Sequence, residues 1–277
     1  MTIRLRPDRA LFRFSGPDAQ KLLNDVLTTR VEAMPGPARW WALLSPQGKI
    51  QAEGLIGWTG GAFWLDAHES VADAFFKRMR MYRLRADVTM DDLRGTHRVG
   101  WFGGTLHDGP LEQRDGRDER LGTRLITTVD EAKAWGEPDN GQAVARITAG
   151  VAELGPDFGP DQVFPHDIGM DFLGGVDFKK GCYVGQEVVS RMQHRGTARR
   201  RPVIVDGVPR GAGSGAPVLV GEREAGTIGE PANGQAVAIL RLDRIDPASP
   251  PTVGGLPVTL SLPRWAAYKF GELPAEA

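Results

Sequence analysis

Residues 179–187 of the chain read Lys-Lys-Gly-Cys-Tyr-Val-Gly-Gln-Glu and contain its single cysteine, Cys182. The apolar spacing over 184–192 predicts a helix that begins in this stretch and ends near Gly196. A helix N-terminus and neighbouring lysines both favour a thiolate over a thiol, so Cys182 is a candidate nucleophile. The flanking glycines would let a ligand or another backbone segment approach closely. The competing interpretation is a buried cysteine that packs as a small apolar side chain.

Irregular sequence precedes this stretch. Residues 155–177 are rich in glycine, aspartate and proline with little periodicity, and such a run inside a domain is often functional. It includes Asp167, which follows Phe164-Pro165-His166. A carboxylate fixed after a proline can accept hydrogen bonds from a ligand with adjacent N–H donors. The ordinary interpretation is a turn aspartate that caps its own backbone.

Two windows of the chain are basic and free of acids, although the net charge is only −1. Such clusters create a strong local field even in a nearly neutral protein. Guanidinium groups bind carboxylates and phosphates bidentately, which suits an anion site or an RNA contact, whereas the alternative is a pair of solvated faces. The cations are Lys77, Arg78, Arg80, Arg83 and Arg85 in residues 77–85, and Arg191, Arg195, Arg199, Arg200 and Arg201 in residues 191–201.

The composition bounds the class of protein. The chain has 277 residues, enough for two or three domains, and its single cysteine excludes an internal disulfide or an iron–sulfur cluster held by this chain alone. Its five histidines show no HxxxH or HExxH spacing, so we expect no metal site. No apolar stretch approaches a membrane span, and the first residues lack the apolar core of a signal peptide. We therefore expect a monomeric, cytoplasmic protein without a membrane anchor.

Local patterns before residue 142 mix strands and helices. The expected elements are a strand at 11–14, a helix that has Pro17 at its first position and runs to 27, strands on both sides of a Gly60-Gly61 turn, a helix over 69–82, a strand over 84–90, a loop over 104–120 and a strand over 125–129. The β-β-α-β order over 50–90 indicates an α+β layer with a helix on one sheet face.

The pattern changes after Pro202. Short strands separated by glycine and proline are expected at 203–208, 216–220, 227–229, 236–242 and 256–262. This predicts a small all-β unit, a sandwich or a barrel, beyond a boundary near residue 201.

The cysteine octapeptide, residues 180–187, resembles the K-G-C-[FY]-x-G-Q-E signature of the YgfZ family. These are folate-binding proteins related to the glycine-cleavage T-protein, an aminomethyltransferase. The resemblance extends along most of the chain, with its segments in the family's order. The further segments are Phe14 to Ala19 with Leu27-Thr28, Pro46 to Lys49, Tyr82 to Arg85, Arg146 to Val151 and Ala238 to Arg241.

The resemblance implies an α+β fold in which three parts surround a central folate-binding hole, with a C-terminal β-barrel. Residues 1–200 would form the folate-binding part, made of 1–48 and 142–200 with an inserted α+β part at 49–141. Residues 201–277 would form the barrel domain.

The resemblance also implies tetrahydrofolate as the cofactor and Cys182 as the catalytic residue. Asp167 matches the place of a carboxylate that pairs with the pterin ring, whose amino group and N3–H are adjacent donors. One of Arg199, Arg200 and Arg201 would meet the glutamate carboxylates of folate. The octapeptide supplies the other cofactor-binding candidates, Lys180, Gly181, Tyr183, Gly185, Gln186 and Glu187.

The sequence also departs from the T-protein pattern. T-proteins lack the cysteine octapeptide, which moves the implied function away from glycine cleavage. Asp73 lies near the place of a catalytically important T-protein aspartate, but the motif around it is absent.

Three functions remain as hypotheses. The first is a tetrahydrofolate-binding protein that supports iron–sulfur cluster assembly or repair in client enzymes, including tRNA-modifying ones, through Cys182. Because the chain has one cysteine, iron–sulfur client or assembly proteins would be required as partners. The second is a folate-dependent aminomethyltransferase or demethylase, an enzyme of one-carbon transfer. The third is a non-catalytic module that contacts tRNA through the basic windows.

Overall fold

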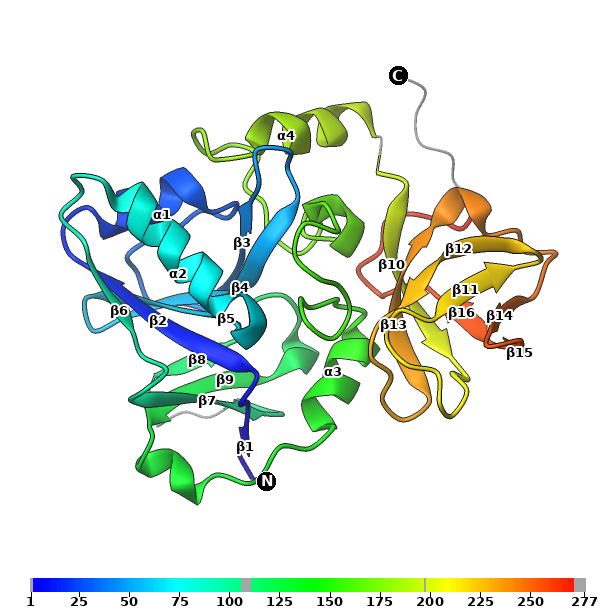
Figure 1. The fold of residues 1–277 in the computed structure, drawn as a ribbon, viewed down its shortest axis with the longest axis horizontal. Helices are drawn as coiled ribbons and strands as arrows, with labels where there is room; N and C mark the ends of the chain where they lie inside the picture. The colour runs from blue at the N-terminus through cyan, green and yellow to red at the C-terminus, as the bar shows by residue number, and fades with distance from the viewer. Residues whose placement is uncertain (1, 106–110, 197, 272–277) are drawn as a thin grey trace.

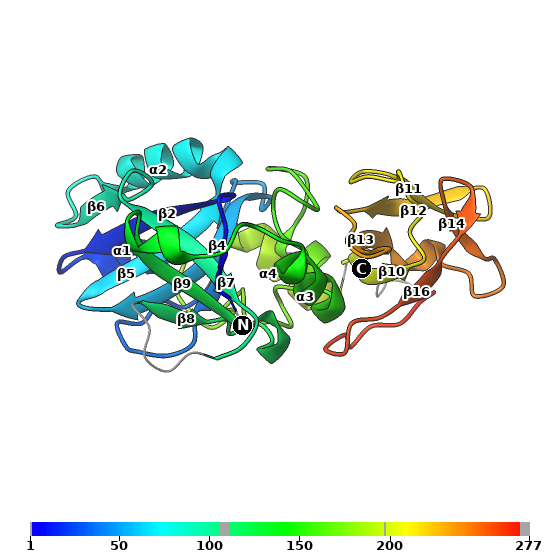
Figure 2. The ribbon, with the colours of Figure 1, turned by 90° about the horizontal axis from the view of Figure 1, so that it is seen from below.

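Within residues 2–105, 111–196 and 198–271, which this computed structural model describes, the strands assemble into three antiparallel sheets. Two sheets lie together in the N-terminal part of the molecule (Figure 1). The third forms the C-terminal unit, on the far side of α3 (Gly141–Ala149) and α4 (Gln186–Arg195) (Figure 2). The prediction of an α+β protein with a C-terminal barrel is confirmed.

The first sheet has the strand order β3-β4-β5-β2-β6. Its elements are β2 (Arg9–Ser15), β3 (Arg39–Leu44), β4 (Ile50–Thr59), β5 (Ala62–His68) and β6 (Thr89–Asp92), with the helices α1 (Ala19–Val26) and α2 (Glu69–Arg83). Gly60 and Gly61, at φ of 57° and 75°, form the turn between β4 and β5 as predicted. Phe75 of α2 packs on Phe12 and Trp41, with ring centroids 5.2 and 4.9 Å away, so the apolar face of this helix covers the sheet.

The second sheet has the order β1-β7-β9-β8. Its strands are β1 (Arg4–Leu5), β7 (His97–Phe102), β8 (Glu112–Arg114) and β9 (Thr123–Thr128), and the 3-10 helices η1 (Glu119–Leu121) and η2 (Glu131–Ala134) adjoin it. Val99 and Ile126 pair across β7 and β9 and are both buried together with Leu11 of the first sheet. An apolar layer therefore joins the two sheets.

The third sheet, in the order β15-β14-β11-β12-β13-β10-β16, curls into a nearly closed barrel. Its elements are β10 (Arg200–Asp206), β11 (Pro217–Val220), β12 (Arg223–Ile228), β13 (Gln235–Arg241), β14 (Pro251–Val253), β15 (Leu256–Pro257) and β16 (Thr259–Ser261), with η4 (Leu242–Arg244). Val203, Val205, Val218 and Leu240 are buried in its separate core. Alternation of apolar residues along these short strands explains why the sequence pattern predicts them.

Some local predictions differ from the structure. The strand expected over 84–90 begins only at Thr89, because Leu84 ends α2 with a φ of 44° and turns the chain. Pro17 is not the first helical residue, since α1 begins at Ala19 with Asp18 as its N-cap. The expected loop at 104–120 contains β8 and η1, and its residues 106–110 lie outside the described part. The sequence patterns predict neither the helix α3 nor the strand β14.

The expected division of residues 1–200 stays a prediction. The strands β3 and β4 lie on either side of its boundary at residues 48 and 49, and they pair with each other from Arg39 with Ile56 to Leu44 with Ile50. The first sheet therefore takes strands from both sides of that boundary. Among the described residues, none of the helices combines the length and apolar character that crossing a bilayer requires.

Backbone acceptors at the end of α3 and in the segment after it hold the barrel in place. The indole Nε1 of Trp265 donates to the carbonyl of Ala149 at 2.8 Å. The carbonyl of Pro156 accepts from Ser214 Oγ and from the backbone N–H of Glu230, each at 2.8 Å. The barrel thus docks on residues 149–156.

Asp157 is buried at this junction. Its Oδ2 accepts the backbone N–H of Glu153 at 2.8 Å and pairs with Arg146, and a Cβ on Gly229 of the barrel would lie 1.9 Å from its Oδ1. Burial raises the pKa of Asp157 to about 6, although the Arg146 guanidinium acts in the opposite direction.

This shift predicts a pH dependence of stability. Because the folded pKa of Asp157 lies above the ~3.9 of an unfolded aspartate, its favourable contribution is present below about pH 4 and lost as the pH rises through about 6. The difference in unfolding free energy between wild type and Asp157→Asn should fall by about 2 kcal/mol from pH 4 to pH 7. Urea titrations at several pH values measure it, with the exposed Asp130→Asn as control. Parallel pH profiles for wild type and Asp157→Asn would show that the shift is absent.

Candidate functional site

The structure exposes Cys182 at the edge of a polar groove. The groove has a volume of about 480 Å³ and lies between α1, the loop after it and the start of the octapeptide. Its lining comprises Gln20, Asn24, Asp25, Arg30, Val31, Glu32, Lys179, Lys180, Gly181 and Cys182. Because Cys182 is exposed, the interpretation as a buried apolar cysteine is wrong. The thiol is open to solvent and to a macromolecular partner.

The helix after the cysteine starts later than the sequence pattern predicts. The first residue of α4 is Gln186 and its N-cap is Gly185, so Cys182 precedes the helix and does not begin it. Cys182 therefore lies outside the first turn of α4, where the field of a helix N-terminus is strongest. The helix ends before Gly196, as predicted.

Lys180 holds the octapeptide against α1. Its Nζ donates to the carbonyl oxygens of Asn24 at 2.8 Å and Thr29 at 2.7 Å, and also to that of Leu27. These acceptors lie at and just after the C-terminus of α1, where backbone carbonyls carry partial negative charge. Burial lowers the pKa of Lys180 to about 8. The three ammonium hydrogens are thus engaged within the protein, which gives Lys180 a structural role.

Gly185 allows the octapeptide to contact the 45–48 turn. It has a φ of +79°, and a Cβ at this position would lie 2.6 Å from the carbonyl oxygen of Ser45. Gly48 in that turn has a φ of +78°, and its own Cβ would lie 3.0 Å from Cβ of Val188. Around Gly181, in contrast, a Cβ would meet nothing within 4 Å. The need for glycine is therefore steric at Gly185 and Gly48 but not at Gly181.

The remaining octapeptide residues divide between core and surface. Tyr183 is buried, which raises the pKa of its hydroxyl, and its carbonyl accepts the backbone N–H of Gln186 at 3.2 Å. The half-buried Gln186 is the first residue of α4. Glu187 is exposed and pairs with Arg191 one turn later, at 2.7 Å.

Asp167 and Arg200 form a pair between the irregular run and the barrel. Asp167 lies in the 3-10 helix η3 (Pro165–Ile168), and its Oδ2 accepts Phe164 N–H at 2.9 Å and Arg200 Nη2 at 2.6 Å. Lys49 lies beside them, with its Nζ 3.6 Å from the Phe164 ring centroid. Burial, with a smaller effect from Arg200, lowers the pKa of Lys49. Asp167 is therefore a buried carboxylate next to two cations.

The other arginines at the start of the barrel differ in their contacts. Arg201 Nη1 donates to Asp171 Oδ1 at 2.8 Å and to the carbonyl of His166 at 2.7 Å. The side chain of Arg199 is exposed and makes no ion pair with the residues that the structure describes. Among the three arginines, Arg199 is thus the one whose guanidinium is not engaged.

The two groups of predicted site residues lie near opposite ends of α4. The Nε2 of His166, next to Asp167, lies 3.0 Å from Oε1 of Gln193 near the end of that helix. Cys182 precedes the beginning of the same helix. At 1.5 Å per residue, roughly 10 Å of helix separates Gln186 from Gln193. Neither Asp167 nor Arg200 lines the groove at Cys182.

Asp73 belongs to neither group. It lies on α2 with its side chain 89% exposed, and it pairs with Arg94 at 2.7 Å. Nothing in this position links it to the groove at Cys182 or to Asp167.

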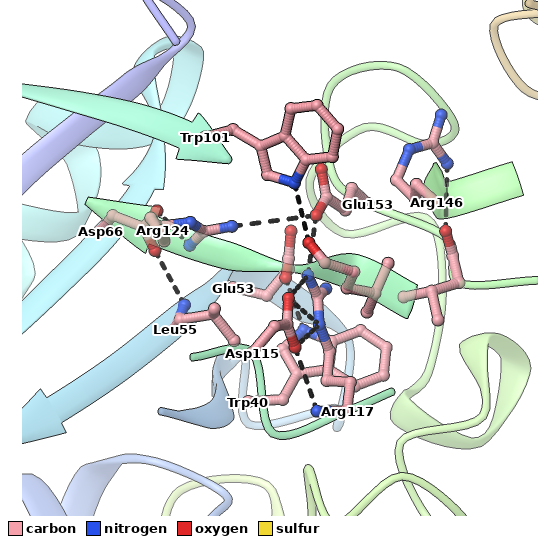
Figure 3. Close-up of polar contacts among 12 residues, drawn as sticks. Trp40, Glu53, Leu55, Asp66, Trp101, Asp115, Arg117, Arg124, Arg146 and Glu153 are labelled. Atoms are coloured by element: carbon pink, nitrogen blue, oxygen red, sulfur yellow. Dashed lines mark hydrogen bonds and ion pairs between the residues drawn. The ribbon is translucent and has the colours of Figure 1, made fainter. Parts of the chain in front are cut away.

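The structure contains a buried network of charged residues that was not predicted from the sequence (Figure 3). Asp66 of β5 accepts the backbone N–H of Leu55 at 2.8 Å and pairs with Arg9 and Arg124. The Oε1 of Glu153 lies 3.0 Å from Nη2 of Arg117. Acids inside otherwise apolar strands, such as Asp66 after Phe-Trp-Leu, are the signal that could have revealed it.

The pKa values of Glu53 and Glu153, two acids of this network, are shifted in opposite directions. Burial raises the pKa of Glu53, whose Oε2 accepts Trp40 Nε1 at 2.6 Å. Burial acts in the same direction on Glu153, but Arg117 and the other arginines around it lower its pKa well below the usual range. Within the described residues, no group of three or more histidine, cysteine or acidic side chains could hold a metal ion.

The role of Lys180 predicts a contrast between neighbouring lysines. Lys180→Met removes the ammonium from the carbonyls at the end of α1 and should lower the unfolding free energy by about 2 to 3 kcal/mol. Lys179 is exposed, so Lys179→Met should change the unfolding free energy by less than about 0.5 kcal/mol. Urea unfolding of both variants measures the difference. Equal stabilities would contradict the structural role of Lys180.

Comparison with known proteins gives matches in both parts of the chain. Residues 198–268 match the family described as the CAF17 C-terminal beta-barrel domain. The iron–sulfur cluster assembly factor IBA57 homolog of Pyricularia oryzae is 30% identical over 210 residues, covering 70% of this chain and 54% of that protein. Mouse IBA57 is 31% identical over 232 residues, covering 72% of this chain and 65% of that protein. The chain thus spans only part of the length of these relatives.

The same comparisons bear on two expectations, the family and the localisation. The relatives named above are iron–sulfur cluster assembly factors of the IBA57 type, so membership of the YgfZ family specifically stays a prediction. The expectation of a cytoplasmic protein is wrong, because these relatives are named as mitochondrial proteins.

A solved structure matches nearly the whole chain. It is the glycine cleavage system aminomethyltransferase T from Bartonella henselae, with a TM-score of 0.74 and 14% sequence identity. The match covers 97% of this chain and 87% of that one. At this identity the likeness establishes the fold alone. The chain therefore has the fold of the glycine-cleavage aminomethyltransferases, completed by a C-terminal barrel of the CAF17 type.

Proposed function

We propose that this protein binds tetrahydrofolate and supports assembly or repair of iron–sulfur clusters in client enzymes, with Cys182 as its reactive residue. The observation that carries the proposal is the exposed thiol of Cys182 on a loop whose neighbouring residues are engaged in fixing it. Relatives named as iron–sulfur cluster assembly factors support the same activity. Clients that modify tRNA belong to this proposal.

An accessible thiol on a loop that is held in place suits transient contact with a cluster. A typical cluster needs about four protein thiolates, so one thiolate of this chain can replace only one ligand of a cluster that a partner holds. The displaced ligand stays with the partner, and no electron is transferred in such an exchange. The groove beside Cys182 leaves room for the partner's cluster-bearing segment.

We infer that the residues around Asp167 would hold the folate. Asp167 is buried with its carboxylate fixed by Phe164 N–H and Arg200, and such a group can accept the adjacent N–H donors of a pterin. Arg199, which is exposed and makes no ion pair with the described residues, would meet the carboxylates of the folate tail. When bound, tetrahydrofolate would supply nitrogen atoms that carry a one-carbon group. The residues of this chain would orient the ring and hold the tail.

The folate site predicts a difference between two aspartates in the same run. Asp167→Asn should weaken tetrahydrofolate binding by about tenfold or more, because a charged hydrogen-bond acceptor is lost. Asp171→Asn breaks the neighbouring pair with Arg201 and serves as the matched control, with unchanged affinity expected. Calorimetric titration under reducing conditions measures the dissociation constants. If the wild-type protein does not bind tetrahydrofolate, the proposed folate site is refuted.

The thiol is tested in a deletion strain. Cys182→Ser should reduce the activity of iron–sulfur client enzymes to the level of the empty strain, because oxygen is a poor replacement for a thiolate ligand. Gly181→Ala, which adds a methyl group in open space on the same loop, should restore that activity. Full rescue by Cys182→Ser would refute the role of the thiol while leaving folate binding unaffected.

The two alternative functions stay predictions. An aminomethyltransferase would release aminomethyl groups to tetrahydrofolate when the other glycine-cleavage components are supplied. A tRNA-binding module would show binding that weakens with salt.

A further inference from the structure

The basic window at residues 77–85 lies along the outer face and C-terminus of α2. Within the described residues, Lys77, Arg80 and Arg85 make no ion pair. Arg78 donates to the amide oxygen of Gln51, and Arg83 has only a long contact to a backbone carbonyl. The cations of this window therefore have no carboxylate partner in the described part of the chain.

The second basic window behaves differently. Arg200 pairs with Asp167 and Arg201 with Asp171, where the barrel meets the irregular run. Arg191 pairs with Glu187 on α4. Carboxylates of the protein therefore neutralise much of the positive charge in residues 191–201. They pair with none of the cations in residues 77–85 within the described part of the chain.

Large apolar side chains are exposed within the same window. Met81 is 66% exposed and Leu84 is 85% exposed, and they lie three residues apart. Leu84 also has a φ of 44°, a conformation that is unfavourable for a bulky side chain. A leucine kept exposed in a strained conformation contributes nothing evident to the stability of this chain. Such an outlier suggests a functional constraint.

A groove runs beside these residues. A hollow of about 680 Å³ is lined by Phe76, Met81 and the cations Lys77, Arg80 and Arg83, with Asp73 at one end. An adjoining hollow of about 490 Å³ shares Phe76, Arg80 and Arg83 and reaches Met90 and Leu93. Asp91 and Asp92 also line it, and their carboxylates are paired with Arg13 and Arg94. The groove between α2 and β6 therefore has apolar residues along its length and unpaired cations on its α2 side, whereas the acids on its β6 side are already paired.

We propose that this groove docks an acidic amphipathic segment of a partner protein. The apolar side chains of the segment would contact Met81 and Leu84, and its carboxylates would pair with Lys77, Arg80 and Arg85. Charge complementarity indicates an acidic partner, and the unpaired cations are free to bind it without first breaking an internal contact. The surface is separate from the groove at Cys182, so docking here does not require the thiol.

Other occupants fit the surface less well. Single-stranded RNA binds by stacking bases on exposed aromatic rings, whereas Phe76 and Tyr82 are half-buried. A membrane surface needs a broad apolar helix face, whereas the inward face of α2 is already buried through Val71, Phe75 and Met79. A protein segment requires only a small apolar contact surrounded by charge.

The proposal is tested with a displayed library of random peptides selected on the purified full-length protein. We expect enrichment of peptides in which aspartate or glutamate flanks leucine, isoleucine or phenylalanine. The dissociation constant of an enriched synthetic peptide should rise at least about tenfold for Lys77→Glu/Arg80→Glu, because like charges then face each other. The control Arg210→Glu/Arg223→Glu, on exposed arginines of the barrel, should bind as wild type does.

Leu84→Gly separates binding from folding. It removes the exposed side chain and the unfavourable φ, so thermal stability should be kept while peptide affinity falls severalfold. Enriched peptides without acidic residues, or affinities that the charge reversal leaves unchanged, would overturn the proposal. Binding of tRNA or of phosphatidylglycerol vesicles that depends on Lys77 and Arg80, without binding of acidic peptides, would also overturn it.

Discussion

The burial of Asp66 between Arg9 and Arg124 is the interaction on which the N-terminal part depends. Arg9 belongs to β2 and Asp66 to β5 of the first sheet, whereas Arg124 belongs to β9 of the second. One carboxylate thus binds cations from two sheets in a region without solvent. Removal of one member of such a set leaves an uncompensated buried charge, which destabilises a fold far more than loss of a surface pair. Glu153 extends the network to the segment on which the barrel docks.

The fold follows from the sequence where periodicity is strong and local. Alternation over Leu11 to Phe14 and the glycine pair at 60–61 correctly predict a strand and a hairpin turn, because side-chain direction and φ are local properties. The turn at Leu84 and the helix α3 were missed. A leucine with positive φ has no sequence signature, and α3 begins at a glycine, a poor indicator of a helix.

The site residues named from the sequence stay predictions, but the structure shows how their contacts differ. Cys182 is exposed beside a groove, in agreement with its place as the candidate nucleophile. The resemblance of residues 180–187 to a family signature, however, does not distinguish the roles of the individual positions. Geometry separates them, because Lys180 binds the end of α1 and Gly185 contacts the 45–48 turn. Contacts between distant segments decide these roles, and they are invisible in a local pattern.

The docking of the barrel has a consequence for how this protein can diverge. The acceptors at the junction are the carbonyl oxygens of Ala149 and Pro156, which belong to the backbone. A substitution changes a side chain but leaves these atoms in place, so the attachment does not require particular residues on that side. An attachment through backbone carbonyl oxygens can persist while the side chains around it change. That is consistent with a shared fold at 14% sequence identity with an aminomethyltransferase.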